Sequence, residues 1–124
     1  MNTSTPNFRE QLEIFNEWKK VYHVNNEGDV VFQNKDFMFN VRFTDNSLHY
    51  IHKNSRGMEN IPKTVIEPDE VWGVWQNVST QIEVLLNYIL VEGKTAYIVQ
   101  TRKGIIENAF LTKNVNKYRV GVVL

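Results

Sequence analysis

The chain has 124 residues, of which 42% are apolar, so it suits one globular domain and leaves too little sequence for two. Its 14 basic and 14 acidic residues give a formal charge of zero, which argues against a protein that coats nucleic acid through charge alone. The sequence contains no cysteine, which excludes structural disulfides and thiolate metal sites. No apolar run reaches the ~18 residues of a membrane span, and residues 1–6 lack the apolar core of a signal peptide, so we expect no membrane partner.

Helical and alternating patterns predict the elements of the first third of the chain. A helix is expected over about Pro6–Lys20, because apolar residues recur there at helical spacing behind a Thr-Pro start. A hairpin is expected next, with strands Val21–Val24 and Val30–Gln33 and with Gly28 at a positive φ in the turn. Alternation over Phe37–Phe43 predicts a strand with one buried face.

The middle of the chain carries shorter signals. The segment Thr44–Ser47 supplies capping side chains, so a short helix is expected over Leu48–His52. One or two helical turns are expected over Ile61–Ile66. Trp72 and Trp75 are three residues apart, which predicts a turn or helix. We expect the rings to pack in the core with one ring partly exposed, a commoner role than base stacking.

The C-terminal part predicts four strands joined by short connections, at Ile82–Leu90, Thr95–Thr101, Ile105–Thr112 and Tyr118–Leu124. These connections leave no room for crossover helices, so the strands should form an antiparallel meander. The predicted fold class is therefore α+β, with an N-terminal helix and short helices packed on a four-stranded antiparallel β-meander.

The richest candidate for chemistry is the histidine pair His49 and His52, followed by Lys53. On a helix these residues share one face, because they are three and four positions apart. Histidine suits proton transfer near neutral pH, and a lysine can balance the charge of a phosphate. The same pattern also fits a solvent-exposed polar face, which is the commoner arrangement for two histidines. No carboxylate in the sequence stands out as a partner for a metal site.

A second candidate group lies in the C-terminal part. Arg102 and Lys103 fall at a tight turn, and Arg119 follows near the end of the chain. Asn108 lies in the middle of a predicted strand, where asparagine is disfavoured, and Thr112 lies four residues further on the same side. An acid–base site needs separated segments to converge, so we expect the histidine helix to pack near the sheet face that carries Asn108 and Thr112.

Three segments carry a resemblance to a known family. They are the strand and helix of Val41–His52, the proline–aspartate segment Ile61–Trp72, and the strands between Tyr97 and Val123. Together they cover about Phe39–Leu124 and resemble the phage-associated branch of the barnase–EndoU–colicin–RelE nuclease superfamily, found in phage head-morphogenesis proteins and polymorphic toxins. The chain 1–124 would then be a single nuclease-like domain, with the helix and hairpin in 1–36, the histidine helix and proline–aspartate segment in 37–80, and the β-meander in 81–124.

The resemblance implies a function. It implies a metal-independent, ribonuclease-like toxin or phage-associated domain that cleaves RNA, tRNA included, by general acid/base transesterification without a cofactor. The protein would act in the cytoplasm, after secretion or delivery as part of a larger protein, and a cognate immunity protein would be a second partner. The alternative is a catalytically inactive binding or phage structural module of the same fold.

The resemblance also implies site residues. The helix histidine, as base or acid, is His52 or His49. His52 is preferred as the neutral base, because the positive charge of Lys53 follows it directly. Asn108 stands where relatives often carry threonine, which is a departure, because an amide cannot act as a hydroxyl does. Thr112 would help Asn108 to orient the phosphate. The remaining residues expected to bind substrate are Lys53, Arg102, Lys103, Tyr118 and Arg119.

Overall fold

The computed structural model describes residues 8–51, 57–79 and 81–124. Helix α1 (Phe8–Val21) begins the described chain and buries Gln11, Phe15 and Trp18 on one face. The predicted helix is therefore confirmed, although its expected start at Pro6 lies outside the described residues. Lys19 Nζ lies 4.4 Å from the centre of the Phe15 ring, which is a cation–π contact at the edge of this face.

The predicted hairpin follows α1 as strands β1 (His23–Val24) and β2 (Val30–Gln33), which pair antiparallel. Gly28 has a φ of 84°, as the turn requires. The next strand, β3 (Asn40–Phe43), is shorter than the predicted Phe37–Phe43. The side chain of Asn34 explains the difference, because it accepts backbone hydrogen bonds in the turn that precedes β3.

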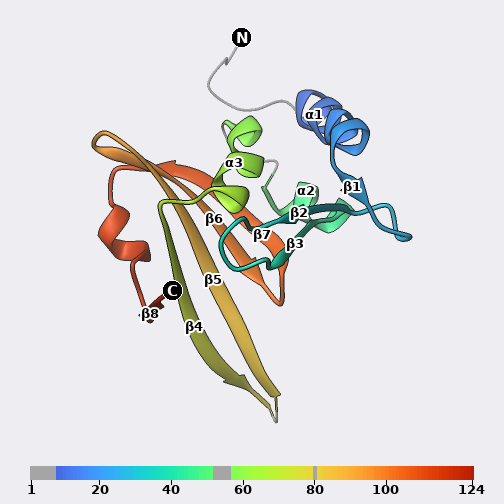
Figure 1. Cartoon of the computed structure of the whole chain (residues 1–124). Helices are drawn as coiled ribbons and strands as arrows, with labels where there is room; N and C mark the ends of the chain where they lie inside the picture. The colour runs from blue at the N-terminus through green and yellow to red at the C-terminus, as the bar shows by residue number, and fades with distance from the viewer. Residues whose placement is uncertain (1–7, 52–56, 80) are drawn as a thin grey trace.

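Three short helical segments connect β3 to the large part of the sheet (Figure 1). They are α2 (Asp45–Ile51), the 3₁₀ turn η1 (Met58–Asn60) and α3 (Ile61–Ile66). Thr44 caps α2 reciprocally with Ser47: Ser47 N donates to Thr44 Oγ1 at 3.1 Å, and Thr44 N donates to Ser47 Oγ at 3.0 Å. The capping expected from the sequence is therefore present.

Four long strands then run antiparallel in sequence order: β4 (Glu70–Val78), β5 (Gln81–Glu92), β6 (Thr95–Arg102) and β7 (Ile105–Thr112). After β7 come the 3₁₀ turn η2 (Val115–Tyr118) and the two-residue strand β8 (Val122–Val123), which pairs with β4. The β4–β5 hairpin extends beyond the rest of the molecule (Figure 1).

The full sheet has eight strands in the order β1-β2-β3-β7-β6-β5-β4-β8. It is mixed, because β3 pairs parallel to β7 through Arg42 and Ile105. The α+β class is confirmed, whereas the predicted four-stranded antiparallel meander is wrong. The N-terminal hairpin joins the same sheet, and the segment expected as a final strand, Tyr118–Leu124, forms only a short pairing at the opposite edge.

The two tryptophans mark another wrong prediction. Trp72 and Trp75 lie on strand β4, not on a turn or helix. In β4 the residues Val71 and Gly73 are buried while Trp72 and Val74 are half-buried, so both faces are partly covered. A strand covered on both faces lacks the apolar–polar alternation that identifies a strand in the sequence.

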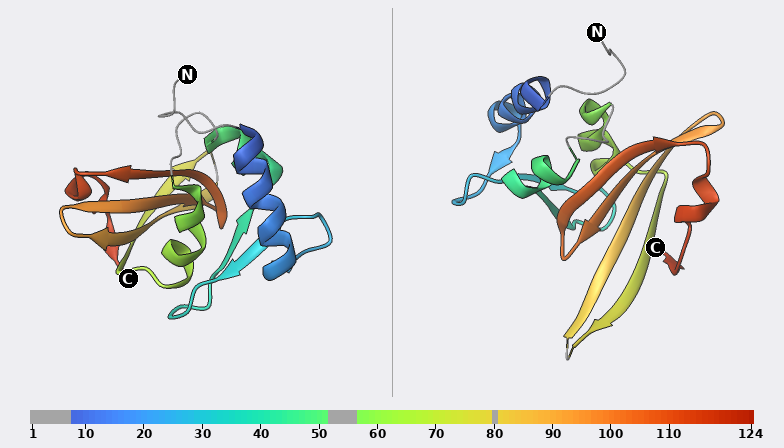
Figure 2. Two further views of the ribbon diagram at one scale, coloured as in Figure 1. Left: turned by 90° about the horizontal axis from the view of Figure 1, so that it is seen from above. Right: turned by 180° about the vertical axis from the view of Figure 1, so that it is seen from behind.

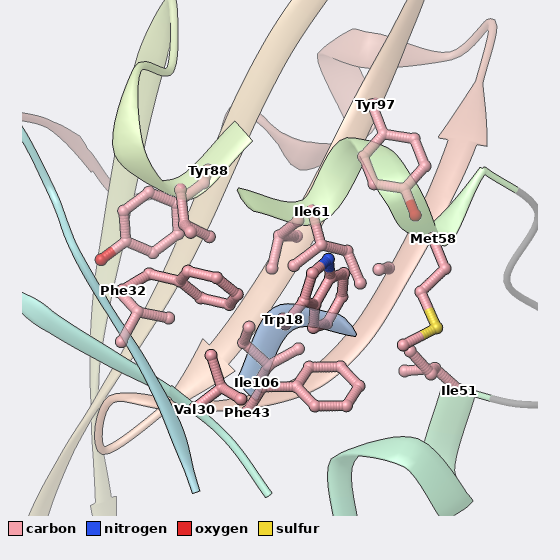
Figure 3. Close-up of a cluster of buried hydrophobic side chains, with 14 of the residues drawn as sticks. Trp18, Val30, Phe32, Phe43, Ile51, Met58, Ile61, Tyr88, Tyr97 and Ile106 are labelled. Carbon is pink, nitrogen blue, oxygen red and sulfur yellow. The ribbon is translucent and has the colours of Figure 1, made fainter. Parts of the chain in front are cut away.

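The main core lies between the helices and one face of the sheet. Figure 3 shows Trp18, Phe32 and Phe43 of the N-terminal part meeting Tyr88 and Ile106 of the long strands. A smaller apolar cluster lies apart from it, where Ile89, Ala96 and Ile98 pack with Trp72, Phe110, Val115 and Tyr118. In both views of Figure 2, α1 and the N-terminal hairpin lie to one side of the long strands.

Candidate functional site

An irregularity between β6 and β7 shapes the candidate site. Gln100 pairs with Asn108, but its neighbour Thr101 pairs with Ile106, so the backbone of Glu107 has no partner in the ladder with β6. This is a β-bulge, in which one extra residue interrupts the ladder and re-aims a side chain. Bulges are over-represented beside active sites, which makes the surroundings of Glu107 a candidate site.

Three adjoining cavities, of about 580, 420 and 390 Å³, all have Glu107 in their walls. The 580 Å³ cavity shares Arg102 with the 420 Å³ cavity and Tyr50 with the 390 Å³ cavity. The two smaller cavities share Gln100. We call the three cavities together the polar trough. It runs from the β6–β7 turn over the bulge to the side of α2.

The β6–β7 turn places two cations in the polar trough. Lys103 and Gly104 have φ values of 54° and 77°, and these positive angles at both central residues are those of a two-residue hairpin turn. Arg42 N donates to Gly104 O at 2.7 Å, which fastens strand β3 to this turn. The side chain of Arg42 thereby joins Arg102 and Lys103 along the largest cavity.

These cations are all paired with carboxylates. Arg102 Nη1 lies 2.6 Å from Glu83 Oε2, and Arg102 Nε lies 3.2 Å from Glu107 Oε1. Lys103 Nζ lies 3.2 Å from Glu83 Oε1. The hydrogen bond from Arg102, and then that from Lys103, lowers the pKa of the Glu83 carboxyl group, and Glu83 raises the pKa of Arg102 in return.

The largest cavity has an excess of acidic groups. Its carboxylates are Glu27, Asp29, Asp45, Glu83 and Glu107, against the three cations Arg42, Arg102 and Lys103. The nitrogen of Arg42 lies 4.0 Å from Asp29, so the third cation also has a carboxylate partner. A phosphate that binds here must therefore take the place of a carboxylate on Arg102 or Lys103.

Side-chain amides line the neighbouring part of the polar trough. Asn87 pairs with Gln100, and Gln100 with Asn108, so three amides form a row across β5, β6 and β7. Asn87 Nδ2 donates to the backbone oxygen of Tyr118 at 3.0 Å, and Asn108 Nδ2 donates to Gln100 Oε1 at 3.4 Å. Tyr50 of α2 stands beside the row, with 62% of its surface exposed.

The polar trough contains three of the residues predicted from the sequence. Arg102 and Lys103 line its largest cavity, and Asn108 lines the smallest. Asn108 lies at the bulge, which explains a polar residue in the middle of a strand.

Two other predicted residues have contacts elsewhere. Thr112 Oγ1 accepts a hydrogen bond from Asn114 N at 3.0 Å, which stabilises the chain where β7 ends. The Tyr118 ring packs on Phe110, with ring centres 4.9 Å apart, between the strand positions of Asn108 and Thr112. Thr112 therefore shares a side of the strand with Asn108, as predicted, but a packed aromatic pair separates the two.

Arg119 is fastened to the start of β4. Its Nε donates to Glu70 Oε1 at 2.8 Å, and its Nη2 donates to Glu70 Oε2 at 2.6 Å. This arrangement suits an anchor of the C-terminal segment better than a phosphate clamp.

Helix α2 packs against β7. Its buried residues Leu48 and Ile51 share the main core cluster with Ala109, whereas Phe110, between Asn108 and Thr112, belongs to the separate smaller cluster. The helix is therefore not buried on the face that carries Asn108 and Thr112, although Tyr50 lines a cavity with Asn108.

His49 is exposed on α2, and its ring stacks on Phe8 of α1, with centroids 5.7 Å apart and planes at 26°. The next residue, Tyr50, lines the polar trough. His52 and Lys53 lie outside the described residues, so their predicted roles stay predictions.

Sequence reasoning missed Glu107, Glu83, Tyr50 and Gln100. A bulge depends on the pairing of two strands, so nothing in the sequence around Glu107 reveals it. Tyr50 lies between His49 and His52 in the sequence. Its exposure depends on how α2 packs beside β7, which the sequence does not show.

No protein-family model matches the chain, and neither a curated protein nor a solved structure matches it significantly. The resemblance to the nuclease superfamily is therefore a proposal and rests on the residues alone. None of the helices in residues 8–51, 57–79 and 81–124 has the length and apolar character to cross a membrane.

Proposed function

We propose that the protein is an endoribonuclease of the toxin or phage-associated kind that the sequence resembles, and that the polar trough is its active site. The observation that carries this proposal is the pair of Glu107 and Arg102, whose atoms lie 3.2 Å apart at a β-bulge inside the trough. A carboxylate beside a guanidinium supplies a base and an anion-binding group, which are the two parts that RNA transesterification needs first.

Each step can be assigned to a group. Glu107 takes the proton of the ribose 2′-hydroxyl, and the freed oxygen attacks the adjacent phosphorus. Arg102 donates N–H groups to the phosphate oxygens as their charge grows, and Lys103 adds a second positive charge. The bond to the 5′-oxygen breaks, and an acid protonates that oxygen, which leaves a 2′,3′-cyclic phosphate and a 5′-hydroxyl. His52, which the sequence suggested as the base, is the proposed acid here, because Glu107 takes the role of the base.

The phosphate must compete with Glu83 for Arg102. Glu83 is held by both Arg102 and Lys103, at 2.6 and 3.2 Å. This arrangement keeps the cations fixed in direction before substrate arrives, but it weakens their attraction for a second anion. Productive binding requires the guanidinium to keep one carboxylate and turn its remaining N–H groups to the phosphate.

One observation favours a second candidate, a non-catalytic binding module of the same fold. Each of the cations that line the largest cavity already has a carboxylate partner, and the carboxylates there outnumber them. Such a surface suits a basic protein partner better than an RNA backbone.

Incubation of the protein with total tRNA and rRNA, with and without a chelator, tests the first candidate. We expect cleavage that persists with chelator and yields cyclic-phosphate ends. Glu107→Gln should lower the rate ~10²–10⁴-fold, the usual share of a general base. Glu92→Gln is the matched control, since Glu92 is exposed at the β5–β6 turn, and it should leave the rate unchanged. A wild-type protein that neither cleaves nor binds RNA would leave the binding module as the better proposal.

A further inference from the structure

The smallest cavity of the polar trough has the make-up of a site for one flat polar ring. It measures about 390 Å³ and is lined by Tyr50, Gln100, Glu107 and Asn108. This volume falls within the usual range for small-ligand pockets, which combine an apolar or aromatic wall with a few placed polar groups. Tyr50 supplies the aromatic wall, and 62% of its surface is exposed.

The hydrogen-bonding groups of this cavity are partly unused. Gln100 Oε1 accepts a bond from Asn108 Nδ2 at 3.4 Å, and within the described part of the chain Gln100 Nε2 donates to no protein acceptor. Asn108 Oδ1 accepts from Ala109 N at 3.0 Å and keeps a second lone pair. The cavity therefore offers a donor at Gln100 beside an acceptor at Asn108.

We propose that this cavity binds one unpaired nucleobase of the substrate and selects guanine and uracil over adenine and cytosine. The inference rests on the proposed function, since it takes the ligand to be RNA. Guanine and uracil present a carbonyl oxygen beside a ring N–H, which complements the Gln100 donor and the Asn108 acceptor. Adenine and cytosine present an amino group beside a bare ring nitrogen, which is the reverse pattern.

Tyr50 contributes affinity without selectivity, because every base has a flat face that can stack on its ring. The base would then lie next to Glu107, which lines the same cavity and also faces Arg102. A nucleotide held in this way has its sugar and phosphate beside the groups that are proposed to act on them.

Titration of the whole protein with the four ribonucleoside 3′-monophosphates, followed by NMR, tests the inference. We expect guanosine and uridine monophosphates to bind roughly tenfold more tightly than the other two, since a matched pair of hydrogen bonds discriminates by that order. Equal affinity for the four, or no binding of any, would overturn the inference.

Three variants separate selection from folding. Gln100→Glu replaces the donors by acceptors of the same shape and should shift the preference toward adenosine and cytidine. Gln100→Leu has a similar side-chain volume and should abolish the preference. Tyr50→Ala should lower the affinity for all four monophosphates alike, by roughly tenfold or more. Gln33→Glu, at the one exposed position of β2, is the matched control and should change nothing. An unchanged preference in Gln100→Glu, with the fold intact by its NMR spectrum, would refute the inference.

The outcome is separable from that of the proposed function. Cleavage of RNA with no preference for guanine or uracil would keep the ribonuclease and refute the base site. A clear preference in binding, without cleavage, would keep the base site and refute the catalysis.

Discussion

Arg119 holds Glu70 through two parallel hydrogen bonds, at 2.8 and 2.6 Å, across 49 residues of sequence. A third guanidinium nitrogen donates to Asn116 Oδ1 at 2.7 Å, and Trp72 Nε1 donates to the same carboxylate at 2.9 Å. The pair joins the segment after β7 to the start of β4. An arginine that the sequence suggested for phosphate binding thus holds the C-terminal segment on the sheet.

This pair should make stability depend on pH. The hydrogen bond from Arg119 lowers the pKa of the Glu70 carboxyl group below its ordinary 4.5, against an opposing effect of burial. The folded-state pKa is below the unfolded one, so the pair stabilises the fold above the unfolded pKa, and this contribution is lost as pH falls through the folded value. Glu70→Gln should therefore lower the urea midpoint at pH 7 and have a smaller effect at pH 3.

The control for this prediction is Glu92→Gln, at an exposed turn, which should shift the midpoint little at either pH. Other carboxylates with lowered pKa values, such as Glu83, titrate in both proteins and cancel in the comparison. A Glu70→Gln effect of the same size at pH 7 and pH 3 would contradict the assignment.

Gly121 offers a second test of how the C-terminal segment is attached. Its φ is 85°, and a Cβ there would overlap the carbonyl oxygen of Gly73 on β4. Gly121→Ala should cost more than the ~1–2 kcal/mol of a left-handed alanine, because β8 must also move off β4. Gly28→Ala is the matched control, with φ 84° and nothing within 4 Å of the new Cβ. Urea unfolding of both variants measures the difference in their free energies of unfolding. Equal losses of this free energy would show that β8 can shift on β4 without destabilising the fold.

Local chemistry explains which elements could be predicted from the sequence. The positive φ of Gly28 and the reciprocal cap between Thr44 and Ser47 depend only on neighbouring residues, so the hairpin and the start of α2 were predictable. Strand β4 was not, because Val71 and Trp72 lie on opposite faces that are both covered. The parallel pairing of Arg42 with Ile105 joins segments that are distant in sequence, so no local pattern predicts it.

Some residues of the candidate site could be predicted from the sequence and others could not. Arg102 and Lys103 were visible as cations at a tight turn, and Asn108 as a polar residue in a strand. Glu83, the partner of Arg102 and Lys103, lies 19 residues before Arg102, and its role depends on the pairing of β5 with β6. The sequence thus indicated the positive charges of the site but not the carboxylates that neutralise them.

Asn34 should be among the most important polar residues for stability. It is fully buried, its Nδ2 donates to Val65 O at 2.9 Å, and its Oδ1 accepts from Asp36 N and Phe37 N at 3.0 and 2.8 Å. Asn34→Ala leaves these groups without partners, at a cost of roughly 1–3 kcal/mol for each one that stays buried. Gln33→Ala, at the exposed neighbouring position, should change the free energy of unfolding by less than about 0.5 kcal/mol. Similar losses in the two variants would mean that water replaces the Asn34 amide.

His49 and His52 should differ in their effects on RNA cleavage. His49 stacks on Phe8, at 5.7 Å between ring centres, so His49→Ala should weaken the contact between α1 and α2 and change RNA cleavage little. His52→Ala should lower cleavage ~10²–10⁴-fold if this residue is the acid that protonates the leaving oxygen. His23→Ala, at the exposed position of β1, is the matched control for loss of an imidazole. Cleavage rates measured on one RNA substrate from pH 5 to 8 test whether a histidine is the acid. With a histidine acid, the cleavage rate falls as the pH rises through the pKa of that histidine. Full cleavage by both His49→Ala and His52→Ala would assign the acid to a group that lines the polar trough, and Tyr50 would be the next residue to replace with phenylalanine.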